Sequence, residues 1–267
     1  MFIHNLNPNL LKIGSVQIRW YGLLFVLGLL FYIFFTRWVF KKANQSVKKL
    51  EDLFIYLFFG FLIGARLGHV FFFQWPYYSK NPGDIIKIWQ GGLNSHGAMI
   101  GLLVAYIIFY FIEKRKNPDF NFYQYSDLLV IGIPIVAMMV RIGNFINAEV
   151  LGRLTNSSWG VVYQSLGENI ARHPVQIYEA IAALIIFFIL LGVFLNKKTK
   201  PYFMTFLFLL LYFGSRFILE FFKKYQILEK SGTWTLGLTM GQALSVIPIL
   251  VTLIYFIYYY PRIKFKE

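Results

Sequence analysis

Long apolar runs separated by short polar segments make up most of this chain. A helix needs roughly 20 consecutive apolar residues to cross the hydrocarbon core of a bilayer. Four runs contain no Asp, Glu, Lys or Arg, and cover residues 20–36, 88–112, 180–196 and 231–261. Three others contain one charged residue, an arginine in each case, and cover residues 53–79, 128–148 and 201–219. The pattern predicts seven membrane-spanning helices, near residues 18–37, 53–73, 92–112, 127–147, 176–195, 202–222 and 240–260.

The predicted fold class is therefore all-α, a polytopic membrane bundle in which residues 1–267 form a single integral membrane domain. Composition agrees, since 58% of the residues are hydrophobic and only 14% are charged. A soluble domain of this length would need more charge to cover its surface. The chain has no cysteine, which excludes disulfides, thiolate metal ligands and a cysteine nucleophile.

The distribution of positive charge indicates an orientation. The net charge of +14 is by itself compatible with nucleic acid or anionic lipid as a partner. However, 14 of the 26 Lys and Arg residues follow the first, third, fifth and seventh predicted helices. Only eight lie before the first helix or after the second, fourth and sixth. Because cytoplasmic loops carry the excess, we expect the N-terminus outside, the C-terminus in the cytoplasm, and no nucleic-acid partner.

Charged and amide side chains inside the apolar runs need a reason, because a charge at the centre of a bilayer costs about 2.5–3.5 kcal/mol. The fourth predicted helix ends in RIGNFINAE, which contains Arg141, Asn144, Asn147 and Glu149. The asparagines could instead cap the helix or bind neighbouring helices. Four polar groups so close together favour a binding site, which the predicted topology places toward the outer leaflet.

The sixth predicted helix carries a second polar stripe. Tyr212, Arg216 and Glu220 are spaced at i, i+4 and i+8, so they share one helix face. A structural ion pair beside an interfacial tyrosine is the alternative interpretation.

The third predicted helix opens with several glycines and a histidine. Gly91, Gly92, Gly97 and Gly101 would thin the helix so that a ligand or another backbone can approach. His96 lies among them, and imidazole can accept a proton near neutral pH. A packing role for this histidine is the alternative.

Polar residues also occur at other outward helix ends. Tyr21, in WYG, suits an interfacial aromatic belt, and Arg66, in GARLGHV, suits close packing around a buried cation. The motif HPVQIYEA contributes Glu179, although helix capping accounts for most of that motif. Together these residues predict an outward-facing polar cavity lined by arginines. Guanidinium groups match phosphate oxygens, so we expect the arginines to be counter-ions for a phospholipid head group rather than partners for their own helices.

Two other classes of protein are possible. A transporter or channel could gate an anion with buried arginines, but we find no inverted repeat and no paired helix breaks. A structural membrane scaffold would leave three buried arginines without a reason. We expect no cofactor and no metal, because no cluster of metal-ligating residues is visible.

Five motifs resemble the prolipoprotein diacylglyceryl transferase family, in the family's order: HGAMIG (96–101), RIGNFINAE (141–149), RHPVQIYEA (172–180), YFGSRFILEFF (212–222) and MGQALSVIP (240–248). The resemblance spans nearly the whole chain and implies a seven-helix protein of the bacterial inner membrane. It also implies transfer of the diacylglyceryl group of phosphatidylglycerol to the lipobox cysteine of a prolipoprotein signal peptide. The products are a thioether and glycerol phosphate, in the first step of bacterial lipoprotein maturation.

The resemblance further implies roles for single residues. Arg141 would bind the phosphate, and Asn144 and Glu149 would hold the polar head. Arg216 and Glu220 would form a second essential pair, and His96 would be the candidate base. The implied substrate-binding set is Arg141, Asn144, Asn147, Glu149, Tyr21, Arg66 and Tyr212.

The nucleophile comes from the substrate, which agrees with an enzyme that has no cysteine of its own. A free thiol has a pKa near 8.5, so a base or a nearby cation must favour the thiolate. His96 as base and Arg216 as electrostatic partner are both open alternatives.

The chain departs from the family pattern at four positions. Ala98 and Ala148 stand where glycine is commoner, Leu151 replaces a frequent tryptophan, and Lys223 stands where arginine is usual. Because lysine cannot form a bidentate fork, Lys223 is not among the expected site residues.

Overall fold

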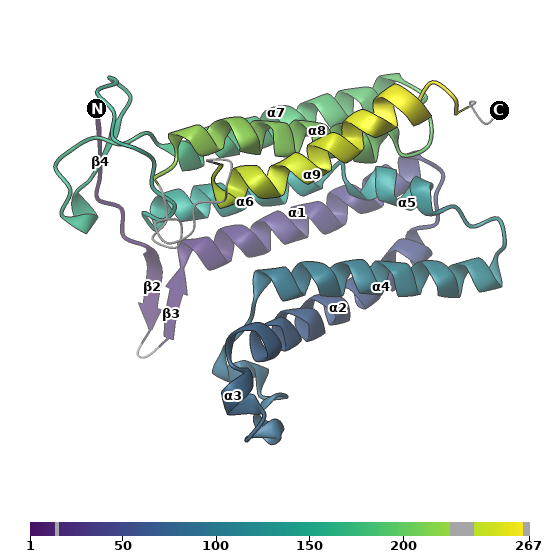
Figure 1. Ribbon diagram of the computed structural model, residues 1–267, viewed down its shortest axis with the longest axis horizontal. Coiled ribbons are helices and arrows are strands. Elements are labelled where there is room, and N and C mark those ends of the chain that lie inside the picture. Colours follow the sequence, from purple (N-terminus) through teal and green to yellow (C-terminus); the bar gives the residue numbers. More distant parts are fainter. Residues whose placement is uncertain (14–15, 225–237, 264–267) are drawn as a thin grey trace. The chain divides into compact units, whose positions relative to one another are not determined.

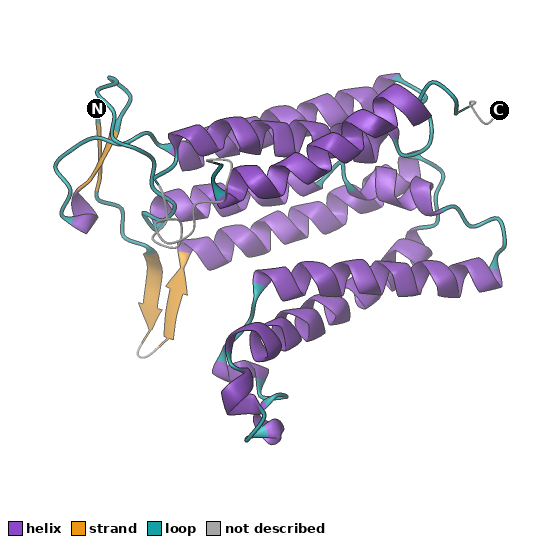
Figure 2. Cartoon of the chain, in the orientation of Figure 1, coloured by secondary structure: helices purple, strands orange, loops and turns teal. Residues whose placement is uncertain are grey.

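The computed structural model describes residues 1–13, 16–224 and 238–263. Two compact units form, one from Met1–Thr36 with Tyr123–Glu267 and the other from Arg37–Phe122. Both units are mainly helical, and the described strands lie in the first unit (Figure 2). The expectation of one integral membrane domain over residues 1–267 stays a prediction.

The predicted number of membrane helices is confirmed. Among the residues that the structure describes, seven helices are long and apolar enough to cross a membrane, one at each predicted place along the chain. The α-helices are α1 (Trp20–Lys42), α2 (Val47–Phe73), α3 (Trp75–Tyr78), α4 (Ser95–Lys116), α5 (Phe122–Leu129), α6 (Ile133–Ile146), α7 (Val175–Asn196), α8 (Phe203–Leu219) and α9 (Met240–Ile254). Short 3₁₀ turns cover Pro82–Asp84, Ile88–Gln90, Gln164–Leu166 and Glu220–Phe222, and the π-helical turn Tyr255–Tyr259 continues α9.

In the first unit, α6 packs against α7, α7 against α8, and α8 against α9 (Figure 1). The helix α1 joins this group through aromatic contacts, since the rings of Phe31 and Phe35 both lie against Phe187 of α7. Its Gly28 faces Met139 of α6, where an added Cβ would lie 3.2 Å from the methionine Cβ. The helices therefore enclose a core in which the side chains of Ile186, Phe187 and Leu190 of α7 are buried.

The fourth predicted helix is interrupted, which the apolar pattern did not indicate. The helix α5 ends at Leu129, and α6 begins at Ile133 with Pro134 in its first turn. Proline has no backbone N–H, and its ring clashes with the carbonyl four residues earlier, so the helix cannot continue through this point. One carbonyl left free at the break, that of Leu129, accepts a hydrogen bond from the hydroxyl of Tyr32 at 3.1 Å.

The third predicted helix begins later than expected. The side chain of Asn94 caps α4 by accepting a hydrogen bond from the backbone N–H of Gly97 at 2.8 Å. Gly91 and Gly92 precede the helix with φ angles of 85° and 74°, a conformation that glycine adopts readily. The prediction that these two glycines thin the helix was wrong, because they form the turn before it.

In the second unit, glycines on α2 and α4 face each other. An added Cβ on Gly64 would lie 2.4 Å from the carbonyl oxygen of Gly97. On Gly101 it would lie 2.0 Å from that of Gly60. The two backbones therefore touch, as small residues permit in membrane helix pairs. The predicted close approach at Gly97 and Gly101 is confirmed.

Among the described residues of the first unit, four strands lie outside the helices. The strand β1 (Phe2–His4) pairs in parallel with β4 (Val161–Tyr163), and β2 (Asn9–Ile13) pairs antiparallel with β3 (Val16–Arg19). The hairpin of β2 and β3 leads directly into α1 (Figure 1). The β1–β4 pair joins the start of the chain to the connection between α6 and α7.

Candidate active site

A chain of alternating charges links α6, α7 and the 3₁₀ turn that follows α8 in the first unit. The Nε of Arg141, on α6, lies 3.0 Å from Oε2 of Glu179 on α7. The other oxygen of Glu179 lies 2.8 Å from Nζ of Lys223, just after α8. That ammonium also lies 3.0 Å from Oε2 of Glu220. The order Arg141–Glu179–Lys223–Glu220 places each cation beside at least one carboxylate.

Burial makes this pairing necessary. The side chains of Arg141 and Glu179 are 18% and 8% exposed, and those of Lys223 and Glu220 are both 11% exposed. A buried charge without a partner destabilises a protein strongly. In a well-paired charge, attraction to the partner offsets the free-energy cost of removing the charge from water. The network therefore allows four charges to sit inside an apolar bundle.

The predicted polar cluster at the end of α6 forms a second branch. Asn144 and Asn147 donate to the two carboxylate oxygens of Glu149, at 2.9 Å and 3.2 Å. The guanidinium of Arg141 reaches Oδ1 of Asn144 at 3.4 Å through Nη1. The structure thus brings all four residues together. Glu149 itself is exposed, so this branch runs from the buried network to the surface of the unit.

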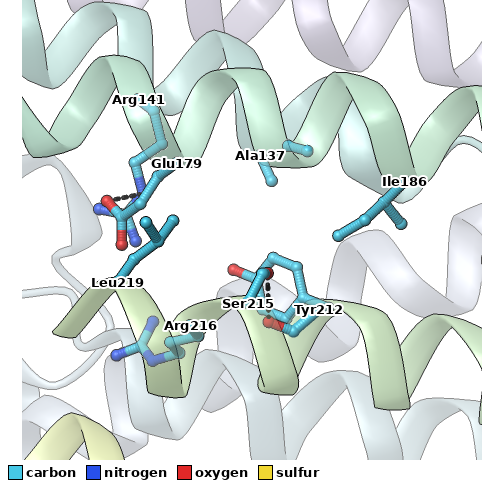
Figure 3. Close-up of a pocket in the computed structure, with 9 residues that line it drawn as sticks. Ala137, Arg141, Glu179, Ile186, Tyr212, Ser215, Arg216 and Leu219 are labelled. Atoms are coloured by element: carbon cyan, nitrogen blue, oxygen red, sulfur yellow. Dashed lines mark hydrogen bonds and ion pairs between the residues drawn. The ribbon is translucent and has the colours of Figure 1, made fainter. Parts of the chain in front are cut away.

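A cavity separates Arg141 and Glu179 from α8. Figure 3 shows these two residues on one side of the opening and Tyr212, Ser215 and Arg216 on the other. Its volume is about 20 Å³, which leaves room for about one water molecule. The full lining is Ala137, Arg141, Glu179, Ala183, Ile186, Tyr212, Ser215, Arg216 and Leu219.

Arg216 and Glu220 do not pair with each other. The helix α8 ends at Leu219, and Glu220 begins a 3₁₀ turn. Its carboxylate lies against Gly241, where an added Cβ would be 2.5 Å from the carboxyl carbon. The first turn of α9 is at this point, and a helix N-terminus attracts negative charge. Glu220 thus faces Lys223 and α9, and within the described part of the chain Arg216 has no carboxylate partner.

Tyr21 lies beside the same cluster. An added Cβ on Gly143 would be 2.8 Å from Cδ2 of Tyr21, so the absence of a side chain at Gly143 makes room for the phenol ring. The first turn of α1 therefore packs next to the part of α6 that carries Arg141 and Asn144.

Two predicted site residues belong to the second unit. Arg66 is 4% exposed and donates to the backbone carbonyls of Asp84, Ile85, Gly91 and Gly92, at 2.6 to 3.3 Å. These bonds hold the connection between α2 and α4 in place. His96 lies exposed in the first turn of α4. Lipid binding by Arg66 and base catalysis by His96 stay predictions.

The expected catalytic and substrate-binding residues included neither Glu179 nor Lys223, although Glu179 was among the polar residues expected to line the outward-facing cavity. The uncharged run was counted from residue 180, whereas α7 already begins at Val175, so Glu179 is a buried carboxylate within the helix. The criterion applied to the arginines, a charge inside an apolar span, would have identified it. Lys223 was set aside because it is not an arginine, yet a single ammonium bridges two carboxylates here without any bidentate geometry.

The fold and the site define a multi-pass membrane protein with a charged site beside a small cavity inside its helix bundle. The chain matches the family described as prolipoprotein diacylglyceryl transferase over residues 8–258. Similar proteins named phosphatidylglycerol–prolipoprotein diacylglyceryl transferase include that of Tolumonas auensis, 38% identical over 92% of this chain and 93% of the relative. Those of Pasteurella multocida and Wolbachia pipientis are 38% and 37% identical, over 92% and 95% of this chain and 87% and 95% of the relatives. The chain belongs to the prolipoprotein diacylglyceryl transferase family, as its motifs predicted, and the relatives are transferases.

Proposed function

We propose that this protein transfers the diacylglyceryl group of phosphatidylglycerol to the lipobox cysteine thiol of a prolipoprotein signal peptide. The products are a thioether-linked precursor and glycerol phosphate, and the step is the first in bacterial lipoprotein maturation. One observation carries the proposal: Arg141 and Arg216 line the same cavity inside an apolar bundle. The relatives of this chain are named for phosphatidylglycerol and prolipoprotein as substrates.

The reaction is a substitution at the glyceryl carbon next to the phosphate. A sulfur electron pair forms the S–C bond, and the C–O bond to the phosphate breaks. The bonding electrons leave on the phosphate oxygen, so negative charge builds up there, and the thiol proton passes to a base or to water. This balance requires no oxidant, metal or cofactor.

Arg141 is suited to hold the leaving phosphate. Its Nε is engaged by Glu179 and its Nη1 by Asn144, while Nη2 has no hydrogen-bond partner among the described residues. The carboxylate therefore fixes the direction of the guanidinium and leaves donors for a phosphate oxygen. Stabilising charge that develops at one preorganised donor contributes about 2.7–4 kcal/mol in a water-excluded site.

Arg216 supplies the second cation. Because no carboxylate of the described chain neutralises it, its charge is available to a phosphate or to the substrate thiolate. A nearby cation lowers the pKa of a thiol and so favours the nucleophilic form. His96 as general base is the alternative for the same step. The cavity must widen when a head group enters, because its present volume of about 20 Å³ is that of about one water molecule.

The proposed setting is the bacterial inner membrane, with the N-terminus outside, the C-terminus in the cytoplasm and the site toward the outer leaflet. The excess of Lys and Arg in alternate connecting segments supports this orientation. Both substrates are membrane-bound there, so phosphatidylglycerol and the signal-peptide helix meet by lateral diffusion.

The test uses the purified protein in detergent with phosphatidylglycerol and a synthetic lipobox peptide, without nucleotide or metal. The expected result is a gain in peptide mass equal to one diacylglyceryl group. A peptide with serine in place of the lipobox cysteine is the control and should stay unmodified. Arg141→Ala should abolish the transfer while the protein still folds. An unchanged mass with the wild-type protein would refute the proposed function, and near-normal transfer by Arg141→Ala would remove the role of that residue.

A further inference from the structure

The turn that carries Glu149 is strained. Ala148 and Val150 adopt φ angles of 53° and 54°, a left-handed conformation that non-glycine residues rarely adopt and that costs about 1–3 kcal/mol at each position. Glu149 lies between them, and its carboxylate turns back toward Asn144 and Asn147. Such a conformation persists only where the surrounding structure holds it.

Two buried side chains from elsewhere in the chain bind backbone carbonyls on either side of Ala148, one in the last turn of α6 and one at Glu149. The Nε2 of His4 lies 2.8 Å from the carbonyl oxygen of Phe145. The side-chain amide of Gln176 donates to the carbonyl oxygen of Glu149. Both His4 and Gln176 are 0% exposed, so water does not compete for these bonds.

Tyr163 connects the two. Its ring lies 4.9 Å from the imidazole of His4, centroid to centroid, and its hydroxyl donates to Oε1 of Gln176 at 3.3 Å. It is also 0% exposed. The parallel pairing of β1 with β4 places His4 directly opposite Tyr163. The two strands thus fix His4 against Tyr163, and Tyr163 fixes Gln176.

His4 acts here as a single hydrogen-bond donor. A carbonyl oxygen can only accept, so the proton is on Nε2, while the buried Nδ1 has no partner among the described residues. A buried polar atom without a partner destabilises the fold. A phenylalanine would pack against Phe145 and Tyr163 without that cost, so the bond to Phe145 explains why a donor stands at this position.

We propose that His4, Tyr163 and Gln176 form a positioning bracket for the turn 147–150. The bracket keeps Glu149 and Asn144 directed toward the phosphatidylglycerol head group. None of its three residues lines the cavity between Arg141 and Arg216. They are positioning residues, so their loss weakens lipid binding more than it slows the chemical step. The proposal rests on the proposed function of the site.

The test compares two substitutions of His4 in the full-length protein. His4→Phe keeps the ring packing and deletes the donor, whereas His4→Gln keeps an N–H that can reach Phe145. We expect His4→Phe to raise KM for phosphatidylglycerol about tenfold with kcat changed less than about twofold, and His4→Gln to stay within about threefold of wild type. Gln176→Met removes the other hydrogen-bond donor and should raise KM as His4→Phe does. It replaces His4→Phe in the test if the His4→Phe protein does not accumulate in folded form.

A second experiment relieves the backbone strain at Ala148. Glycine adopts positive φ without cost, so Ala148→Gly in the His4→Phe background should restore KM to within about threefold of wild type. Ala182→Gly in α7 is the control and should restore nothing. A wild-type KM in folded His4→Phe, equal losses in His4→Phe and His4→Gln, or no rescue by Ala148→Gly would each overturn the proposal.

Hydrogen exchange separates this proposal from the proposed function. Amides of residues 147–150 should exchange at least about tenfold faster in His4→Phe than in wild type or His4→Gln, because the bracket holds them closed. This measurement needs no turnover. Faster exchange with an inactive wild-type enzyme would refute the transferase and leave the bracket intact, whereas unchanged exchange would refute the bracket alone.

Discussion

Glu179 holds Arg141 from the neighbouring helix, with Oε2 3.0 Å from Nε. The sequence led us to expect a cation reserved for lipid phosphate, and for Arg141 that expectation was incomplete, because the bundle itself supplies a counter-ion. Arg216, in contrast, has no carboxylate partner in the described chain. Of the two arginines at the cavity, Arg141 is oriented by a carboxylate. The charge of Arg216 is not balanced by any carboxylate among the described residues.

Glu179→Gln should inactivate the protein and destabilise it. The amide cannot balance Arg141 and Lys223, and removing one partner of a buried pair costs about 3–5 kcal/mol. We expect diacylglyceryl transfer to fall at least about tenfold and thermal unfolding to occur several degrees lower. Glu51→Gln is the matched control, because its pair with Arg37 at 2.8 Å is 42% to 46% exposed and such pairs contribute little. Equal effects of the two substitutions would contradict the role of the network.

Lys223→Arg should retain transfer within about twofold, since a guanidinium can contact both Glu179 and Glu220 as the ammonium does. Lys223→Met keeps the length of the side chain and removes its charge. The two carboxylates would then be close together without a cation, so we expect transfer to fall at least about tenfold. Initial rates with the lipobox peptide measure both variants. A Lys223→Met protein as active as wild type would show that the lysine only fills space.

His96→Asn distinguishes the two ways of activating the thiol. If His96 is the base, kcat should fall about 10²- to 10⁴-fold near neutral pH. Part of the loss should be recovered as the pH rises toward 8.5, where the thiol ionises without help. Rates measured from pH 6.5 to 9 test this. Unchanged turnover across that range would exclude His96 as the base and leave Arg216 as the group that favours the thiolate.

Gly101→Ala should destabilise the second unit. The new Cβ would lie 2.0 Å from the carbonyl oxygen of Gly60, so α2 and α4 would have to separate, and overpacking of this kind typically costs about 1–3 kcal/mol. Gly192→Ala on α7 is the control, because nothing lies within 4 Å of its added Cβ. We expect that substitution to be neutral or stabilising, since alanine favours helix. Thermal unfolding in detergent compares the two, and similar melting temperatures would refute the prediction.

The connection between α6 and α7 should lose stability in acid. Arg172 donates through Nη2 to Glu168 at 2.7 Å and through Nη1 to the carbonyl oxygen of Gly152 at 3.1 Å. The hydrogen bond from Arg172 holds the pKa of Glu168 below its ordinary value of 4.5. A carboxyl whose pKa is lowered by folding stabilises the folded state above its ordinary pKa and ceases to do so as the pH falls through the folded value. The protection of the amides of residues 150–172 against hydrogen exchange, measured relative to their intrinsic exchange rate at each pH, should therefore fall below pH 4.5.

Glu168→Gln is the control for that prediction. The variant has no carboxyl to titrate at position 168, so these amides should already be less protected at pH 7, and their protection should change less between pH 5 and pH 3. An acid dependence equal to that of the wild type would assign the effect to other groups.

Helix number, fold class and the cluster at the end of α6 could be read from the sequence, because each depends on residues close together in the chain. A run of about 20 apolar residues crosses a bilayer whatever surrounds it. Arg141 and Asn144 are three residues apart and therefore neighbours on any helix. The break before Pro134 and the turn at Gly91 and Gly92 also had local signals, a proline and two adjacent glycines. Both lie inside long apolar runs, so a prediction based on hydropathy alone did not detect them.

The sequence by itself determined a polytopic membrane protein of the prolipoprotein diacylglyceryl transferase family with buried arginines. Only the tertiary structure decided which groups those arginines meet. Glu179 faces Arg141, Glu220 turns to Lys223 instead of Arg216, and His4 reaches Phe145 across 141 residues of chain. Such partners depend on how each helix is rotated about its axis and where each turn ends. Packing between distant segments sets both, because the free energy of burying a charge depends on what the neighbouring helix presents to it.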